Sequence, residues 1–452
     1  MNQKYELLEG VDDMVQVLEK KLQEIFDKQT MYQWEARKTT AEQRAQKLMD
    51  LKEAILSRMD CFVEAASLDF VTPASTAQNQ IYSVIQAIDY AIENVAKWMQ
   101  PELVENPQDG EAYVLYEARG RVCIFGTWNS PMSVTIHPLA EALAAGNCVV
   151  LKPSELNPNY NKVLLEVIEA VFDEQEVALV QGEADVSEQL LKLPFDHFFF
   201  TGSPRVGKIV MREAANHLAA VTLELGGKSP AIIDKGYDLV KAAQNLVFGK
   251  VLMGGQFCIS PDYIFVHKED ITAFAELYRQ MTVGMLYDDG KIRSVERTQI
   301  VNEQHYKRIK NLFEDALAKG AVILSGGAFD DNKRLIEPTL LGGVTAGMLI
   351  AEEEIFGPLT FVRTYTDVEE VLQYIQANPK PLALYMFSDN ENFQQQILAS
   401  TSSGGVTING IFMHNTHLPL PFGGVNHSGI GSFHGIHGFK TFSHNRAIYK
   451  VN

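Results

Sequence analysis

The chain has 452 residues, of which 46% are hydrophobic and 21% are charged, and its formal net charge is −18. This length exceeds the size at which a single hydrophobic core stops growing, and the composition is that of a folded protein, so we expect two or three domains and no long disordered tract. The acidic charge disfavours nucleic acid and anionic membrane surfaces as partners.

The cysteines and the start of the sequence bear on the compartment. Cys61, Cys123, Cys148 and Cys258 lie far apart without paired metal-ligand spacing, which disfavours a disulfide framework and a zinc site and indicates a reducing compartment. The start "MNQKYELLEG" lacks a basic segment followed by an apolar one, and no apolar run reaches about 18 residues. We therefore predict a cytoplasmic protein without a membrane anchor.

The first hundred residues predict helices. Apolar residues recur at three- and four-residue steps over 40–66 and 76–99, with few helix breakers. Residues 101–110 interrupt this pattern. Beyond them, "AYVLYEARGRVCIFGTW" contains two short apolar runs joined near Gly120, and we interpret these runs as the two strands of a hairpin.

Apolar strands and amphipathic helices begin to alternate near residue 147. The first series predicts strands at "NCVVLKPS", "EVALVQG" and "DHFFFTGS", with helices over 159–172, 186–193 and 206–218. The second series, after "LELGGKSP", predicts strands at "AIIDK", "YIFVHK", "AVILSGG", "PLTFVRTY", "ALYMFS" and "GGVTING", with helices over 239–252, 271–281, 297–319, 368–375 and 392–398. This alternation predicts βαβ units and mainly parallel sheets in two α/β halves that meet near Gly226. Residues 418–452 predict an ordered loop and a closing strand.

Two polar residues in glycine-bounded segments are candidates for catalysis. Cys258 follows a predicted helix in "MGGQFCISP", where backbone amides can approach an ionised thiol and a developing oxyanion; the alternative is a buried structural cysteine. Glu224 ends a strand in "VTLELGGK", where burial would raise the pKa of its carboxyl into the range of a general base; the alternative is a structural acid. We interpret Cys61, on the apolar face of a helix, and Cys148, within a strand, as buried structural residues.

Other polar residues follow predicted strands. Asn129 in "GTWNSP" either donates a hydrogen bond to an oxyanion or caps a helix that begins near Val134, and capping is the simpler interpretation. Lys152 and Glu155 follow the strand "CVVL", where they can meet the phosphate or ribose of a nucleotide, or belong to a solvated loop.

The segment "FFFTGSPRVG" places glycines and a serine between a strand and a helix. Gly202, Ser203 and Gly207 stand where a helix N-terminus favours a pyrophosphate, although the segment does not match GxGxxG. We favour a solvent-facing Arg205 over a partner for a 2′-phosphate. The C-terminal histidines lack accompanying carboxylates or cysteines at ligand spacing, so we expect packing and hydrogen-bonding roles and no metal. These histidines are His414, His417, His427, His434, His437 and His444.

The chain resembles the aldehyde dehydrogenase superfamily over almost its whole length. The resemblance is carried by seven segments in order: "TWNSP", "ALAAGNCVVLKPSE", "FTGSPRVG", "VTLELGGKSP", "GQFC", "EEEIFGP" and "LPFGGVNHSGIG". The segments "KPLALYMFS", "TSSGGV" and "SGIGSFHGIHGFKTFSH" are similar to the class 3 branch, which includes fatty, aromatic and coniferyl aldehyde dehydrogenases. The resemblance implies an α/β fold with a Rossmann-type NAD(P)-binding domain (1–99 and 119–226), an α/β catalytic domain (227–427) and a small bridging or oligomerisation element (100–118 and 428–452).

The resemblance also implies an activity, the oxidation of hydrophobic aldehydes to carboxylic acids by a homodimer. Cys258 would be the nucleophile, Glu224 the base that activates water, and Asn129 with the Cys258 amide the oxyanion hole. The cofactor would be NAD or NADP, with Glu155 favouring NAD. The implied cofactor-binding residues are Trp128, Lys152, Glu155, Gly202, Ser203, Val206, Gly207, Glu354 and Phe356.

Several residues depart from the family pattern near the implied acyl pocket. They are Thr127, Ser130, Met253, Phe257 and Asn426. The bulky Phe257 adjoins the nucleophile and either narrows the pocket toward slim aliphatic chains or points away from it. Two alternatives to the dehydrogenase stay open on the residues alone: a cysteine-dependent acyltransferase or hydrolase, and a catalytically silent structural relative.

Overall fold

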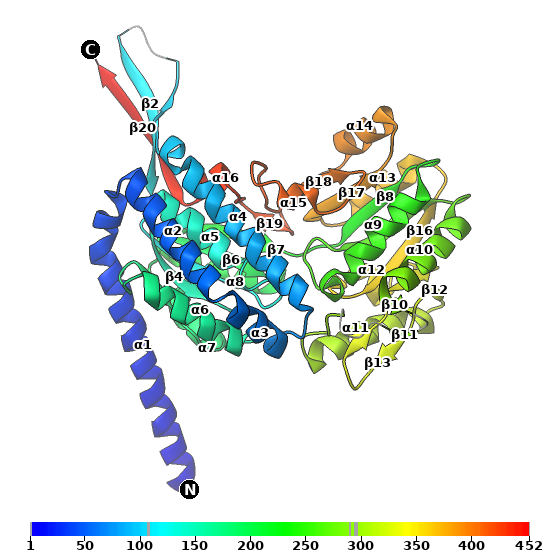
Figure 1. The fold of residues 1–452 in the computed structure, drawn as a ribbon, viewed down its shortest axis with the longest axis horizontal. Coiled ribbons are helices and arrows are strands. Elements are labelled where there is room, and N and C mark those ends of the chain that lie inside the picture. The colour runs from blue at the N-terminus through cyan, green and yellow to red at the C-terminus, as the bar shows by residue number, and fades with distance from the viewer. Residues whose placement is uncertain (1, 106–108, 289–290, 293–296, 452) are drawn as a thin grey trace.

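The computed structural model describes residues 2–105, 109–288, 291–292 and 297–451. The remaining residues of the predicted NAD(P)-binding domain (1), catalytic domain (289–290 and 293–296) and bridging element (106–108 and 452) lie outside the described residues. The chain forms two α/β lobes side by side, with a narrow arm of strands and a long N-terminal helix that extend from the first lobe (Figure 1). The expected α/β class is confirmed.

The first lobe is built on a sheet that, within the described residues, has the order β19-β7-β6-β3-β4-β5. Its strands are β3 (Arg121–Phe125), β4 (Cys148–Lys152), β5 (Val177–Leu179), β6 (His197–Gly202), β7 (Ala220–Leu225) and β19 (Gly429–Ile430). All neighbours are parallel except β19 and β7. The strand order reverses between β3 and β6, and the carboxyl ends of strands at such a point form a crevice that binds ligands.

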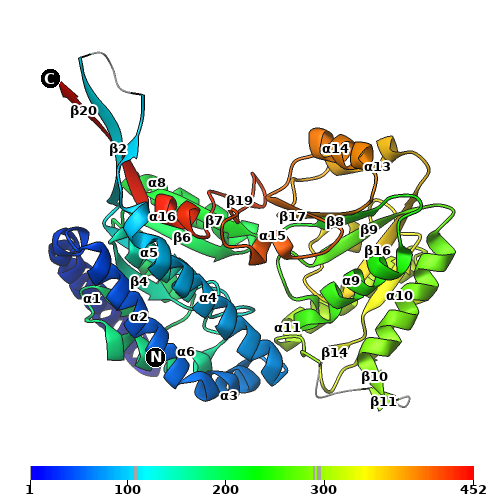
Figure 2. The ribbon, with the colours of Figure 1, turned by 45° about the horizontal axis from the view of Figure 1, so that its top comes forward.

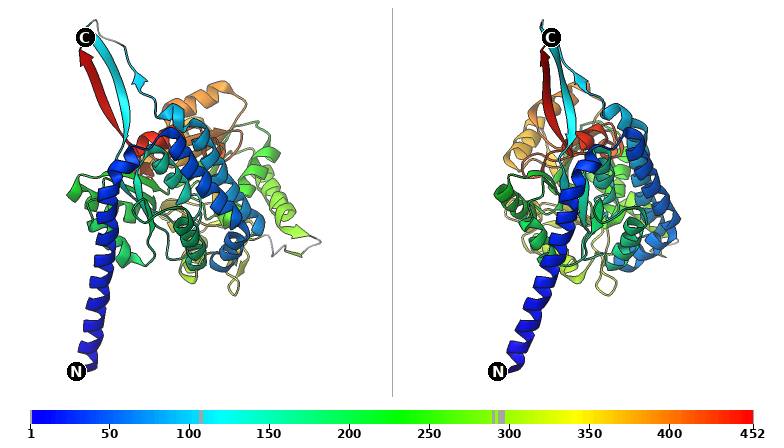
Figure 3. Two further views of the ribbon diagram at one scale, coloured as in Figure 1. Left: turned by 60° about the vertical axis from the view of Figure 1, so that its left-hand side comes forward. Right: turned by 90° about the vertical axis from the view of Figure 1, so that its left-hand side faces the viewer.

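Helices cover both faces of this sheet. They are α1 (Asn2–Arg37), α2 (Ala41–Ser57), α3 (Met59–Asp69), α4 (Ala74–Trp98), α5 (Ile136–Ala145), α6 (Pro158–Val171), α7 (Ala184–Lys192) and α8 (Pro204–His217). The helix predicted over 40–66 is two helices, because Arg58 leaves helical geometry (φ −114°, ψ 14°). The sequence analysis did not predict α1, whose N-terminal part extends away from the body (Figure 3). Its C-terminal half packs Leu22, Ile25 and Phe26 into the core of the lobe.

The second lobe contains a sheet of order β12-β15-β16-β9-β8-β17-β18 in the part of the chain that the structure describes. Its strands are β8 (Ser229–Ile233), β9 (Pro261–His267), β12 (Val322–Ser325), β15 (Thr339–Gly342), β16 (Leu359–Tyr365), β17 (Ala383–Phe387) and β18 (Gly405–Ile408). Only the β12–β15 pair is antiparallel. Two short ribbons accompany it: β10 (Tyr287–Asp288) with β11 (Lys291–Ile292), and β13 (Phe329–Asp330) with β14 (Leu335–Ile336).

The helices of the second lobe follow the prediction closely. They are α9 (Leu239–Val251), the 3₁₀ helix η1 (Leu252–Gly255), α10 (Ile271–Leu286), α11 (Glu303–Ala318), α12 (Leu349–Glu352), α13 (Val368–Ala377), α14 (Glu391–Ser400) and α15 (Met413–Thr416). The helix predicted from residue 297 begins later, as α11, because the Asn302 side chain caps it by accepting a hydrogen bond from the His305 amide.

The predicted hairpin around Gly120 is wrong. Strand β2 (Gly110–Ala118) and β3 follow one another but belong to different sheets. β2 lies between β1 (Glu102–Leu103) and β20 (Ser443–Val451), and its nine residues pair with all nine of β20 (Figure 2). The alternation of apolar residues in β2 requires a partner strand but does not say which one, and the partner comes from the far end of the chain.

Two further expectations concern side-chain burial and membrane contact. Cys61 is exposed on α3, so its interpretation as a buried structural cysteine is wrong, whereas Cys148 and Cys123 are buried. Among the described residues, no helix combines the length and the apolar character needed to cross a bilayer.

Candidate active site

A cavity of about 700 Å³ lies where β6 and β7 of the first lobe meet η1 and the loop after α12 in the second lobe. Eight of the residues predicted from the sequence line it: Trp128, Asn129, Gly202, Ser203, Glu224, Cys258, Glu354 and Phe356. It is also lined by α4, through Thr76, Asn79, Gln80, Ser83 and Gln86. The wall formed by α4 was not predicted from the sequence, because a polar helix face is ordinarily exposed to solvent.

The turn that carries Cys258 is held in an uncommon backbone conformation. Met253, Gly254 and Gly255 all have left-handed geometry, with φ values of 53°, 60° and 68°. A side chain at Gly255 would overlap the carbonyl oxygen of Gly357. Left-handed geometry is strained for a residue with a side chain, and asparagine tolerates it better than methionine, so Met253 stores strain in this turn.

Gln256 fastens the same turn to its surroundings. Its Nε2 donates hydrogen bonds to the carbonyl oxygens of Met253 (3.0 Å) and Gln299 (2.9 Å), and its Oε1 accepts one from the Val301 amide (3.1 Å). Asn129 Nδ2 donates to the carbonyl oxygen of Gln256 at 3.1 Å, two residues before the thiol. The sequence analysis missed Gln256, since a glutamine between glycines carries no distinctive signal.

Asn129 does not cap a helix. The helix α5 begins at Ile136, seven residues further on, and no side chain caps it. The bond to Gln256 uses one of the two hydrogens on Asn129 Nδ2, and the residue is buried beside Cys258 in the cavity wall. One Nδ2 hydrogen of Asn129 therefore stays available for a further bond, and the donation to an oxyanion stays a prediction.

The Cys258 thiol is partly exposed to the cavity and is not predisposed to ionise. Burial raises its pKa, and the charges of Glu354 and Glu224 raise it further. The backbone amides of Cys258 and Ile259 oppose this by lowering the pKa. The expectation that backbone amides face the thiol agrees with this arrangement, but the nearby carboxylates outweigh them, so attack by the sulfur requires a base.

Glu224 lies near the end of β7, and its carboxyl group has no hydrogen-bond partner among the described residues. The residue is 4% exposed. Burial raises its pKa well above the usual carboxyl value, and the charge of Glu141 raises it further. A carboxyl with a raised pKa that shares a cavity with a thiol has the properties of a general base.

The Glu354 carboxyl lies over the backbone of Gly226, at the junction of the lobes, where any side chain on Gly226 would overlap it. Its pKa is raised to about 8, mainly by burial and then by the charge of Asp262. The Gly227 amide, Lys228 and Arg308 oppose this by lowering the pKa. The Glu354 carboxyl therefore changes its charge close to neutral pH.

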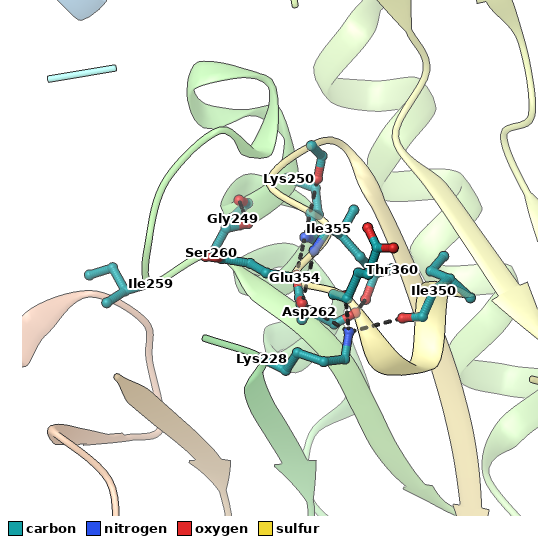
Figure 4. A network of polar contacts seen from close by, with 12 residues as sticks. Lys228, Gly249, Lys250, Ile259, Ser260, Asp262, Ile350, Glu354, Ile355 and Thr360 are labelled. Atoms are coloured by element: carbon teal, nitrogen blue, oxygen red, sulfur yellow. Dashed lines mark hydrogen bonds and ion pairs between the residues drawn. The ribbon is translucent and has the colours of Figure 1, made fainter. Parts of the chain in front are cut away.

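Asp262 and two lysines support the loop that carries Glu354 (Figure 4). Lys228 Nζ lies 3.1 Å from Asp262 Oδ2 and donates to the carbonyl oxygens of Ile350 and Glu353. Lys250 Nζ lies 3.8 Å from Asp262 Oδ1, and its burial lowers its pKa to about 8. The Ile355 amide donates to Asp262 Oδ2 at 3.2 Å, so one buried carboxylate fixes both ends of the loop.

The residues predicted to hold a pyrophosphate occupy the start of α8. Ser203 is the N-cap residue, and its Oγ accepts a hydrogen bond from the Val206 amide at 3.4 Å. Gly202 and Ser203 line the cavity, and a helix N-terminus there favours an anion. Gly207 does not line the cavity; a side chain there would meet Leu225 at 2.8 Å, so this glycine permits close packing of α8 on β7. Arg205 is exposed, as expected.

Lys152 and Glu155 stand at the carboxyl end of β4, outside the cavity wall. Lys152 is buried and donates to the carbonyl oxygen of Pro153 at 2.9 Å. Its Nζ lies 3.9 Å from Glu155 Oε2, and the Glu155 side chain is 49% exposed. Lys152 pairs with Phe125 of β3, so Lys152 and Glu155 lie on the same edge of the sheet as Trp128 and Gly202. Such a row of residues suits an extended ligand such as a dinucleotide.

Four of the five departures from the family pattern line the cavity, and Asn426 does not. Thr127, Ser130, Met253 and Phe257 line it. Phe257 therefore faces the cavity, and its ring packs edge-on against Phe412 with centroids 5.4 Å apart. Within the described ranges, no group of three or more histidine, cysteine, aspartate or glutamate side chains is arranged to hold a metal ion.

Comparisons with known proteins agree with the resemblance in the sequence. A model of the aldehyde dehydrogenase family matches residues 13–448. The chain is 42% identical to AldX of Bacillus subtilis, which is named as an aldehyde dehydrogenase, over 96% of this chain and 99% of the relative. It is 39% identical to aldehyde dehydrogenase family 3 member A2 of Macaca fascicularis, over 89% of this chain and 83% of that one.

Two further similarities concern assembly and structure. The chain is 39% identical to a rat aldehyde dehydrogenase described as dimeric and NADP-preferring, over 81% of each chain. The solved structure of a substrate-bound aldehyde dehydrogenase from Staphylococcus aureus matches 95% of this chain and 94% of its own, with a TM-score of 0.90 and 35% identity.

Gly255→Ala is expected to destabilise the protein through the left-handed turn before Cys258. The new side chain adopts a strained φ and overlaps the Gly357 carbonyl, so the midpoint of thermal unfolding should fall by several degrees. Gly236→Ala is the matched control, because Gly236 has φ +84° but nothing within 4 Å of the new atom. Calorimetry gives the unfolding midpoint of both variants. The loss in Gly236→Ala reports backbone strain alone, and any further loss in Gly255→Ala reports the overlap with Gly357. Equal losses at the two positions would show that the packing against Gly357 is unimportant.

Proposed function

The chain belongs to the aldehyde dehydrogenase family and oxidises aldehydes with NAD or NADP, and we propose that Cys258, Glu224 and Asn129 carry the reaction on hydrophobic aldehydes. The observation that supports this most directly is the meeting of these three side chains in one cavity. The dinucleotide supplies the acceptor for the hydride that leaves the aldehyde carbon. Residues of this chain carry out the attack on the aldehyde and the hydrolysis of the thioester.

The first half of the reaction is attack by sulfur. The pKa of the Cys258 thiol is raised, so the thiol gives its proton to a water in the cavity as the sulfur attacks. The sulfur forms a bond to the carbonyl carbon and gives a thiohemiacetal, whose oxygen accepts hydrogen bonds from Asn129 Nδ2 and the Cys258 amide. Loss of hydride from this carbon leaves a thioester on Cys258.

The second half is hydrolysis of the thioester. Glu224, as the carboxylate, removes a proton from water, and the resulting hydroxide attacks the thioester carbon. The carbon–sulfur bond then breaks and the sulfur takes the proton of the new carboxyl group, which releases the carboxylate and regenerates the Cys258 thiol. Glu224 suits this role because burial and Glu141 raise its pKa, so its carboxylate is a stronger base than an exposed one.

Cofactor contacts are proposed for the residues along the sheet edge. Gly202, Ser203 and the first turn of α8 would take the pyrophosphate, and Lys152 with Glu155 the adenosine ribose. Glu354, Phe356 and Trp128 would contact the nicotinamide end, since they share the cavity with Cys258. The exposed Glu155 carboxylate would repel a 2′-phosphate, which favours NAD.

The apolar side of the cavity supports hydrophobic substrates. Phe257, Leu252, Phe422 and Phe433 contribute to its wall. Because Phe257 faces the cavity, we propose that it narrows the acyl pocket. The cytoplasmic location stays a prediction from the sequence.

Steady-state kinetics over aliphatic aldehydes of increasing length and aromatic aldehydes, each with NAD and with NADP, test the proposed specificity. We expect kcat/KM to rise with chain length because each buried CH₂ adds about 0.8 kcal/mol of binding, and to be higher with NAD. Phe257→Ala should raise kcat/KM for branched and aromatic aldehydes relative to straight-chain ones. A preference for short polar aldehydes would contradict the proposal for the substrate while leaving aldehyde oxidation intact.

The roles of Glu224 and Cys258 are separated by rapid mixing. Glu224→Gln is expected to lose about 10²-fold or more of turnover, since hydrolysis needs the base, yet to retain a first burst of reduced dinucleotide. Cys258→Ser should lose both the burst and turnover. The readout is absorbance at 340 nm after mixing enzyme with aldehyde and dinucleotide. Loss of the burst in Glu224→Gln would assign this residue to thiol activation instead.

A homodimer is proposed through the arm made by β1, β2 and β20 (Figure 1). β20 forms an edge of this sheet, and its side chains Tyr449 and Val451 are exposed, as is Leu103 on β1. An exposed strand edge with apolar residues favours pairing with another chain. The rat relative described as dimeric supports a second copy of this chain as the partner.

The arm is tested by measuring mass with light scattering on a sizing column. We expect the wild type to elute with the mass of two chains. The double variant Tyr449→Glu, Val451→Lys should elute with a mass closer to one chain, because both new charges lie on the exposed arm. Leu218→Lys, on the exposed end of α8 in the first lobe, serves as a control for added charge. A monomeric wild type, or a dimer that survives the double substitution, would exclude this interface.

A further inference from the structure

A buried acid and a buried histidine stand on α5, a helix with no other charged group, and the histidine lines the same cavity as the proposed base. The helix α5 is buried along its whole length, and it carries His137 and Glu141 one turn apart. Glu141 Oε1 lies 3.2 Å from His137 Nε2, and Glu141 is 2% exposed. Neither residue belongs to the reaction as described above, and desolvating a carboxylate is costly.

The fold makes room for this acid. A side chain at Gly438, on α16 (Ile436–Thr441), would overlap the Glu141 carboxyl, so the absence of a side chain there opens the space that the carboxyl fills. The backbone amides of His434 and Gly435 favour the ionised form of Glu141, whereas burial raises its pKa. A helix and a glycine therefore give the carboxyl its place, and neither of its oxygens makes a hydrogen bond with the described residues.

Glu141 is electrostatically coupled to Glu224. Its charge is the one that, besides burial, raises the pKa of Glu224. Three groups of this cluster, Glu224, His137 and His434, also line the same cavity. Two carboxyl groups that share a low-dielectric site have linked proton affinities, because ionisation of one raises the proton affinity of the other.

The cluster continues toward a second cavity. The His137 and His434 rings stack with centroids 4.5 Å apart and planes inclined by 13°. One turn after His434, His437 lines a cavity of about 540 Å³ at the base of the arm, together with Arg119, Lys440 and His444. The Phe422 ring stacks on the His434 ring with centroids 5.3 Å apart and on the His414 ring of α15 at 6.3 Å. The pKa of His434 is lowered by burial and by the charges of His137, His414 and His437.

The reaction needs a route for protons. Oxidation of one aldehyde by one water and one dinucleotide gives a carboxylate, the reduced dinucleotide and two protons, of which one comes from the thiol and one from water. The proton from the attacking water passes through Glu224 in the proposed function, so its buried carboxyl must be deprotonated once in each turnover. The Glu224 carboxyl has no hydrogen-bond partner within the described residues that would take this proton directly.

We propose that Glu141 and His137 receive the proton of Glu224 and pass it through His434 to His437 and the second cavity, an inference that rests on the proposed role of Glu224. In each step only a bond to hydrogen breaks and another forms, and water takes the proton at His437. The N–H bonds of stacked imidazoles lie in the ring planes, so transfer between His137 and His434 runs through a water at the cavity wall that both rings line.

Glu141→Gln tests this role, because glutamine keeps the volume and loses the titrating group. We expect the first burst of reduced dinucleotide to persist and kcat at its pH plateau to fall about tenfold, within the range of proton-transfer effects. Added imidazole buffer should restore kcat in proportion to its concentration, and the solvent deuterium isotope effect should increase. His137→Gln should behave in the same way and serves if Glu141→Gln does not fold.

A purely electrostatic role gives a different result. Loss of the Glu141 charge lowers the pKa of Glu224, so the acidic limb of the kcat profile would move to lower pH while the plateau stayed within twofold of wild type. That outcome, or a lower plateau that imidazole does not restore, would overturn the relay. The matched control is His197→Gln, a buried histidine on β6 that bonds Thr222 and not Glu141, and it should respond to neither test.

The role of Glu141 as a proton acceptor and the role of Glu224 as the base are tested separately. If the wild type reduces dinucleotide with aldehydes and Glu224→Gln shows a burst without turnover, the role of Glu224 stands whatever the result at Glu141. If Glu224→Gln turns over normally, the proton donor of the relay is lost and both ideas are wrong.

Discussion

The burial of carboxyl groups where the two lobes meet is the constraint on which the site depends. Glu224 and Glu354 both line the cavity that contains the Cys258 thiol, and the pKa of each carboxyl is raised by loss of water. A site that contained only these groups would hold every one of them protonated and would be chemically inert. Reactivity therefore depends on donors that favour charge at defined points, such as the amides around the sulfur and the Asn129 side chain.

The surrounding structure provides two kinds of partner for its other buried carboxyl groups. On the side of the second lobe, Asp262 is neutralised by Lys228 and Lys250, and the resulting rigid network holds the Glu354 loop (Figure 4). On the side of the first lobe, Glu141 has the His137 imidazole as its partner. The buried acid is thus paired with two lysines in the second lobe and with one imidazole in the first.

The sequence predicted those parts of the molecule whose signal is local. Alternating apolar strands and amphipathic helices gave both parallel sheets, and Cys258 and Glu224 stood out as polar residues within glycine-bounded segments. The errors concern partners distant in the chain. The partner of β2 lies more than 300 residues away, and the Asn129 amide contacts a carbonyl 127 residues further on. Nothing in the sequence marked His137 and Glu141 as neighbours of Glu224, because an amphipathic pattern does not say which helix covers which strand.

The pairing of Glu224 with Gly429, between β7 and β19, sets an order of events during synthesis. The strand that carries the base is made when half of the chain is still to come, and its outer edge has no partner until residue 429 has left the ribosome. In the meantime, the second lobe is synthesised in full next to an open strand edge. The site is therefore completed last by the final two dozen residues, and truncated chains that end before β19 contain the thiol and the base without the strand that aligns them.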